Sequence, residues 1–86
     1  MPEISRFFGI VIRMYFSDHG PPHFHAVYAD QEFKIRIDLP GLMRGDPPPR
    51  VLAMVIEWAR LHEKELLENW QRLRAQGSAL PIPPLE

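Results

Sequence analysis

Three of the four histidines in this chain fall within one short stretch, at His19, His23 and His25. His23 and His25 are two residues apart in a segment expected to be a strand, so their side chains leave the same face. His19 precedes them across a Pro-Pro loop, and Asp18 stands beside it. Imidazole is the commonest ligand of zinc and similar metals, and a catalytic site needs three protein ligands and one open position. The spacing therefore predicts a divalent-metal site, for example for zinc, with ligands His19, His23 and His25.

Two other uses of the same residues stay open. Imidazole titrates near neutral pH, so His23 and His25 are also candidates for a metal-free acid and base pair, with Asp18 orienting His19. Alternatively, these side chains only stabilise the loop through hydrogen bonds to the backbone. The sequence lacks a phosphate-binding loop, a dinucleotide fingerprint and a nucleophile elbow, which gives nucleotide-dependent and serine-hydrolase chemistry little weight.

Basic side chains are expected on the same outer sheet face as the histidines. Arg13, Lys34 and Arg36 are candidate phosphate contacts, because a basic and aromatic sheet face is typical of single-stranded RNA binding. An ordinary solvated face gives the same pattern. His62, on the predicted helix, is an auxiliary candidate that meets the loop histidines only if the helix crosses near the start of the third strand.

The strands that must position these residues follow from the hydrophobic pattern. Apolar residues alternate over residues 4–16, which predicts strand, and Gly9 favours two short strands over one long strand. Residues 23–29 and 33–39 predict a β-hairpin that turns around residues 29–32. The alternation leaves open whether the histidine side chains point toward the helix or away from it.

One long helix is predicted over residues 50–76. Its apolar residues recur at spacings of three, four and seven, which makes one stripe along the helix: Leu52, Ile56, Ala59, Leu66, Trp70 and Leu73. Residues 40–49 are expected to be a connector, and the proline-rich tail 78–86 is expected to dock on the body. The predicted fold class is α+β in one domain, residues 1–86. Three to four antiparallel strands form the sheet, and the C-terminal helix packs on one of its faces.

Composition narrows the class of protein. Ten basic and eleven acidic side chains leave a formal net charge of −1 in 86 residues, which excludes the strongly basic balance of a dedicated nucleic-acid binder. The absence of cysteine excludes thiolate ligands and disulfide bonds. No apolar run approaches the roughly 18 residues of a membrane span, and residues 1–6 lack the apolar stretch of a signal peptide. We therefore expect a cytoplasmic protein with no membrane partner.

Four segments of the chain carry a family resemblance: Met1–Ile10, Asp18–Ala26 with its D-H-x-P-P-H-x-H pattern, Glu57–Trp70 and Ile82–Leu85. They resemble domain-of-unknown-function family 4160, a family of small bacterial proteins of uncharacterised function. Its members are often encoded beside a second small protein family. By analogy, the resemblance implies one component of a two-gene, toxin–antitoxin-like module, with a neighbouring gene product as its partner.

Two functional expectations follow, and the sequence does not decide whether the protein is an enzyme. The first is a module component whose histidine-rich site is the working site. The alternative is a metal- or histidine-dependent nuclease or hydrolase acting at the loop of His19, His23 and His25, with RNA as a possible substrate.

Overall fold

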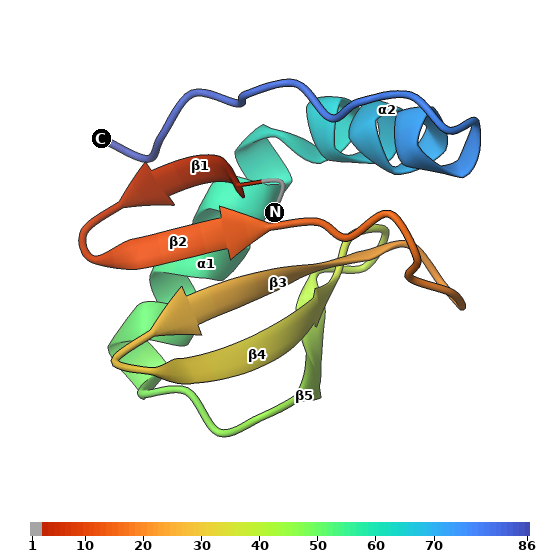
Figure 1. Cartoon of the computed structure of the whole chain (residues 1–86). Coiled ribbons are helices and arrows are strands. Elements are labelled where there is room, and N and C mark those ends of the chain that lie inside the picture. The colour runs from red at the N-terminus through yellow and green to blue at the C-terminus, as the bar shows by residue number, and fades with distance from the viewer. Residues whose placement is uncertain (1–2) are drawn as a thin grey trace.

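The sheet is a five-stranded antiparallel meander with two helices packed on it (Figure 1). The computed structural model describes residues 3–86. The strands follow one another in chain order, each pairing with the next. The elements are β1 (Glu3–Phe7), β2 (Ile10–Arg13), β3 (His23–Tyr28), β4 (Gln31–Arg36), β5 (Gly41–Arg44), α1 (Pro49–Leu61) and α2 (Glu63–Arg74). The predicted α+β class with an antiparallel sheet is confirmed.

The expectation of three to four strands was wrong, because the sheet has five. Residues 3–13 form two strands joined at Phe8 and Gly9, which take positive φ values of 49° and 78°, as a two-residue hairpin turn requires, and residues 14–16 of the predicted range lie outside the strands. The fifth strand, β5, lies in the segment expected to be a connector. The pair Pro40-Gly41 spans the start of β5, and this pair is a turn signal between Ile37 and the apolar Leu42.

The second hairpin is tighter than its predicted bounds. Ala29 and Asp30 take positive φ values of 51° and 65°, so these two residues make the whole turn. Strand β4 therefore begins at Gln31, two residues before the predicted start, and it ends at Arg36. This shift brings Glu32 into the sheet, opposite Val27.

The expected single helix over residues 50–76 is two helices that meet at His62, whose backbone (φ −122°) leaves the helical region. The buried helix residues keep one spacing through this break, which explains why the pattern predicts a single helix: Val51, Val55, Trp58, Ala59, Leu66, Asn69, Trp70 and Leu73. α1 covers one face of the sheet, and α2 turns across its end (Figure 1). A straight helix would carry the second apolar stretch past the sheet. Neither helix in the described chain has the length and apolar character needed to cross a membrane.

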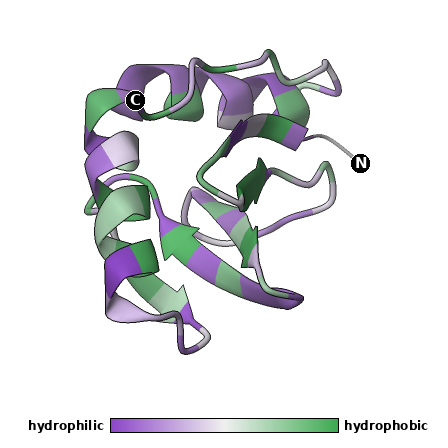
Figure 2. Cartoon of the chain, turned by 90° about the vertical axis from the view of Figure 1, so that its left-hand side faces the viewer, coloured by the Kyte–Doolittle hydropathy of each residue, from purple (hydrophilic) through white to green (hydrophobic). Residues whose placement is uncertain are grey.

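The main core lies between α1 and the sheet. Hydrophobic and hydrophilic residues alternate along the strands (Figure 2). Trp58 of α1 is fully buried and packs against Phe7 at 5.4 Å and Phe24 at 5.7 Å between ring centroids. Because Phe24 points to α1, its strand neighbours His23 and His25 point to the opposite face. The structure thus decides the orientation that the sequence left open.

The C-terminal tail runs back over the body along α2 and β1 (Figure 1). The amide of Asn69 is buried and makes two hydrogen bonds to Leu80: its Nδ2 donates to the carbonyl oxygen at 2.9 Å, and its Oδ1 accepts from the backbone N–H at 2.8 Å. Farther along, the N–H of Ile82 donates to the carbonyl oxygen of Ile4 at 2.8 Å. The tail therefore lies beside the outer strand β1.

Candidate metal site

Two histidines on the central strand β3 form the base of the candidate site. His23 and His25 occupy the face of the sheet opposite α1, yet they are only 2% and 8% exposed. Aromatic rings cover them: Trp70 of α2 lies 5.2 Å from His23, and Tyr15 lies 4.5 Å from His25, between ring centroids. The site is therefore a buried cluster on this face of the sheet, covered by α2 and by the segment after β2.

Asp18 completes the group from the loop between β2 and β3. Its Oδ2 accepts a hydrogen bond from Nε2 of His25 at 2.9 Å and lies 3.3 Å from Nε2 of His23. These three residues are the one group of potential metal ligands within residues 3–86, and one ligand atom from each lies within 4.8 Å of the others. The fold thus brings two imidazoles and one carboxylate to a single point.

The two nitrogens of His23 have different surroundings. Nδ1 lies 2.9 Å from the carbonyl oxygen of Pro21, which can only accept, so Nδ1 carries a proton and donates. Nε2 is buried and has no hydrogen-bond partner, even though Asp18 Oδ2 is 3.3 Å away. In the neutral ring this Nε2 holds a lone pair. A buried acceptor without a partner costs about 1–3 kcal/mol, which a ligand at this position would recover.

His25 is held from its other side by an outer carboxylate. Its Nδ1 lies 3.2 Å from Oε2 of Glu32, and the hydroxyl of Tyr15 donates to the same oxygen at 2.6 Å. Burial, reinforced by the Glu32 hydrogen bond, raises the pKa of the Tyr15 hydroxyl, while Arg13 lowers it. The hydroxyl therefore remains a donor at neutral pH and fixes the carboxylate against the imidazole.

These distances fit a bound divalent metal. Metal–nitrogen and metal–oxygen bonds of about 2.0–2.2 Å place neighbouring ligand atoms roughly 2.9–3.4 Å apart in octahedral or tetrahedral geometry. The separations of 2.9 and 3.3 Å from Asp18 to His25 and His23 fall in this range. Both histidines would bind through Nε2 and donate through Nδ1 to an oxygen, which is the usual outer arrangement of histidine ligands. Two histidines and one carboxylate would leave the other coordination positions of the metal open to water or substrate.

Arg74, at the end of α2, secures the loop that carries Asp18. Its guanidinium donates to the carbonyl oxygen of Phe16 at 2.6 Å and to that of Asp18. The same group lies over the ring of Trp70, 4.4 Å from the centroid. One side chain thus joins α2, the aromatic roof and the Asp18 loop.

The structure places two of the predicted histidines away from the site. His19 is exposed on the loop and does not belong to the group, in which Asp18 takes the third position. His62 lies at the junction of the helices, with Nδ1 3.0 Å from Oε2 of Glu65 and its ring 5.6 Å from that of Trp58. Because Trp58 packs on the other face of the sheet, His62 does not reach the cluster of Asp18, His23 and His25.

The predicted basic residues lie around the histidines. Arg13 is directly opposite His25 on β2, and Lys34 is opposite it on β4. Arg36 is opposite His23 and donates to Asp38 at 2.6 Å, an exposed pair that occupies its guanidinium.

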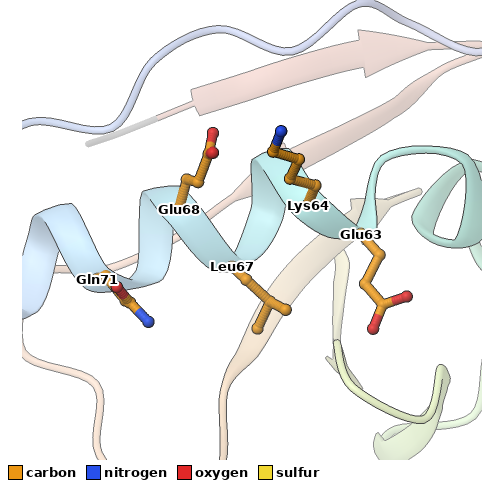
Figure 3. A pocket seen from close by; sticks show the side chains of 5 residues that line it. All are labelled: Glu63, Lys64, Leu67, Glu68 and Gln71. Atoms are coloured by element: carbon orange, nitrogen blue, oxygen red, sulfur yellow. The ribbon is translucent and has the colours of Figure 1, made fainter.

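A separate shallow pocket runs along α2 (Figure 3). Its lining comes from this one helix alone: Glu63, Lys64, Leu67, Glu68 and Gln71. No second element closes this pocket and no histidine lines it. It therefore does not bring reactive side chains from different elements together.

Three contributors to the site were missed by sequence reasoning. The sequence pattern places Glu32 in a turn rather than on the sheet face. It places Trp70 on the apolar stripe of the helix and gives no signal for Arg74. Ala-Asp at a hairpin turn is a weak signal for the bounds of β4, and no sequence signal joins Arg74 to a loop more than fifty residues away.

The fold and site define a small α+β protein with a buried cluster of two histidines and one aspartate. Residues 9–71, more than half of the chain, match the family model described as a domain of unknown function, DUF4160. The chain belongs to this family. No curated protein and no solved structure matches the chain.

Proposed function

We propose that this protein binds one divalent transition metal through Asp18, His23 and His25 and uses it in hydrolysis. The observation that carries the proposal is the buried Nε2 of His23, which has no partner, points into the cluster and is fixed in direction by the Pro21 carbonyl. A metal-free general base would also need an unpaired nitrogen, but that nitrogen must reach the substrate, whereas Nε2 of His23 is buried. Three protein ligands with an open position are typical of catalytic rather than structural zinc sites.

Each neighbouring residue has a role in this proposal. A bound metal would supply Lewis acidity and lower the pKa of a coordinated water. Glu32 Oε2 lies 3.2 Å from Nδ1 of His25, where it would accept the imidazole proton once Nε2 binds the metal, and Tyr15 holds Glu32 in place. Trp70 covers the cluster and excludes water from one side.

The test is metal content and metal affinity. Tag-free protein from metal-supplemented medium, measured by elemental analysis, should carry about one equivalent of metal. The His23→Ala/His25→Ala double variant should carry none. Since both histidines are buried, circular dichroism must show that this variant folds, and the milder Asp18→Asn gives a second reading from a partly exposed loop position.

Titration of the metal-stripped protein with Zn²⁺ and with Mn²⁺ completes the test. One site that is lost in Asp18→Asn supports the proposal. Folded wild-type protein that takes up neither metal would reject it. Hydrolysis that persists in excess chelator but disappears in His23→Ala would assign the chemistry to the histidines alone.

A second candidate is a bacterial, cytoplasmic component of a two-gene, toxin–antitoxin-like module. Family resemblance supports it, and one feature of the sheet favours it. The edge strand β5 pairs with β4 alone among the described residues. Two of its residues, Leu42 and Met43, are each 41% exposed, and Leu39 before it is 73% exposed. An open apolar edge suits a small protein that adds a strand.

Co-expression with the neighbouring gene product tests this role. A stable complex should form, and Met43→Lys, which places a charge on the open edge, should weaken it at least tenfold. Leu80→Lys, at an exposed position on the tail, is the matched control. A complex that tolerates both changes equally, or no complex at all, would remove the β5 edge as the partner site.

A further inference from the structure

The sheet face beside the cluster carries cations without acidic partners. Arg13 and Lys34 flank His25 on the two neighbouring strands, and Arg44 of β5 lies opposite Lys34. Within residues 3–86, none of these three cations belongs to an ion pair. The Nε of Arg13 is also buried without a hydrogen-bond partner. This row of positive charge therefore lacks an anion.

Four of the carboxylates near this face are already engaged, whereas Asp46, two residues after Arg44, forms no ion pair within residues 3–86. Asp18 faces the two histidines, and Glu32 accepts from Tyr15 and faces His25. Two further exposed carboxylates on this side are held by arginines, in the pairs Glu3–Arg6 and Asp38–Arg36. The net charge of −1 for the whole chain therefore does not describe this face.

The length of the row indicates the size of the anion. Neighbouring strands lie about 4.8 Å apart, so the backbone positions from β2 to β5 span about 14 Å. One phosphate group cannot reach across that distance. An extended chain of phosphates can.

An exposed aromatic residue follows strand β2, three residues after Arg13. Phe16 is 57% exposed, two residues before Asp18, and its carbonyl oxygen is held by Arg74 at 2.6 Å. An exposed ring on a restrained backbone is a platform on which a nucleobase stacks. Tyr15, beside it, already packs against His25.

We propose that this face binds single-stranded nucleic acid, with phosphates along Arg13, Lys34 and Arg44 and one base on Phe16. The strand then passes over the Asp18–His23–His25 cluster. Binding of the strand to this surface does not depend on the proposed metal site. Cleavage of the bound strand does, because it rests on the proposed function. In that step, water oxygen bonds to phosphorus, one phosphorus–oxygen ester bond breaks, and the leaving oxygen takes the proton from water.

Binding is measured by fluorescence anisotropy with a labelled 12-nucleotide RNA and with DNA of the same sequence, both in EDTA. Three phosphate contacts predict that the logarithm of the binding constant falls with the logarithm of salt concentration at a slope of about −2. Binding of either strand with this slope supports the proposal. The strand that binds more tightly, RNA or DNA, identifies the nucleic acid that the surface prefers.

Matched variants locate the surface. Lys34→Gln should reduce the slope by about 0.7, whereas Arg60→Gln, an exposed position on α1, should leave it unchanged. Phe16→Ala should weaken binding about tenfold without changing the slope. Phe8→Ala, at the other end of β2 and 58% exposed, is the control for loss of a surface ring.

Two results overturn the proposal. The first is a Kd weaker than about 100 µM for both strands at 50 mM salt, the weak limit of non-specific binding. The second is an equal loss of binding in Lys34→Gln and Arg60→Gln. Binding in EDTA by a protein that takes up no metal would keep this surface and reject the metal site. Metal uptake without strand binding would keep the metal site and reject this surface.

Discussion

The Nδ1 atom of His23 lies 2.9 Å from the carbonyl oxygen of Pro21, two residues earlier in the chain. This contact makes the Pro-Pro loop part of the site. Proline fixes φ and offers a carbonyl but no N–H, so the loop presents a rigid acceptor to the imidazole. The donor nitrogen of His23 is thereby separated from the nitrogen that faces Asp18.

The first prediction is that metal-free His23 is the Nδ1–H tautomer whenever its ring is neutral. Long-range ¹H–¹⁵N spectra should show a protonated Nδ1 and an unprotonated Nε2 for this residue. Added Zn²⁺ should then shift the Nε2 resonance and leave Nδ1 protonated. A ring protonated at Nε2 would contradict the proposed direction of metal binding.

The second prediction separates the ligand set seen in the structure from the set expected from spacing. Asp18→Asn should weaken Zn²⁺ binding at least 100-fold, because it removes a direct ligand, whereas loss of an outer partner costs about 10–100-fold. His19→Ala should change affinity by less than twofold, because His19 is exposed and lies outside the group. Isothermal titration with both variants distinguishes the two sets, and a larger loss in His19→Ala would restore the three-histidine site.

The third prediction concerns stability at high pH. Burial and the Glu32 hydrogen bond raise the pKa of Tyr15 above its ordinary value near 10. A group with a raised folded-state pKa contributes stability that is present below its unfolded pKa and is lost as pH rises through the folded pKa. Tyr15→Phe should therefore cost about 1 kcal/mol from pH 7 to about 9.5, and the difference should shrink above pH 10. Urea unfolding of both proteins measures this, and a difference that stays constant to pH 11 would argue against the hydrogen bond.

The fourth prediction tests the loop anchor. Arg74→Gln should weaken metal binding about tenfold, because the guanidinium holds the backbone on both sides of Ser17 and covers Trp70. Amide exchange in residues 15–20 should quicken while the strands keep their protection. Arg60→Gln carries the same charge change on α1 and should alter neither measurement. If Arg74→Gln leaves affinity unchanged, the loop holds its position without this anchor.

How far the sequence predicts the site depends on which contacts are local. The two-residue spacing of His23 and His25 puts them on one face of a strand, and that inference needs no tertiary information. The choice between Asp18 and His19 depends on how the Pro-Pro loop turns, and periodicity says nothing about that turn. Glu32 depends on the bounds of the β3–β4 turn, and Arg74 contacts a segment more than fifty residues away, which a local pattern cannot contain.

The fold shows the same division. Period-two alternation predicts the strands, and helical spacing predicts the apolar faces of α1 and α2. The break at His62 keeps the buried residues of both helices at one helical spacing, so periodicity does not reveal it. Strand β5 is four residues long and mostly exposed, so its hydrophobic pattern is too short to mark it. The pair Pro40-Gly41 at its start is the available signal.

The last prediction concerns the tail, which Asn69 holds through paired hydrogen bonds to Leu80. Asn69→Ala should lower the free energy of unfolding by about 1–3 kcal/mol, because a buried amide loses its bonds and the tail loses its attachment. Amide protection of Ile82, which donates to Ile4, should fall with it.

Gln71→Ala is the matched control for this change. It lies on the same helix at an exposed position, so its effect should stay within about 0.5 kcal/mol. Chemical unfolding followed by tryptophan fluorescence reports both variants, because Trp58 Nε1 donates to the carbonyl of Pro83 in the same tail. A small effect of Asn69→Ala together with unchanged protection of Ile82 would show that apolar burial of Ile82, rather than the Asn69 amide, holds the tail on β1.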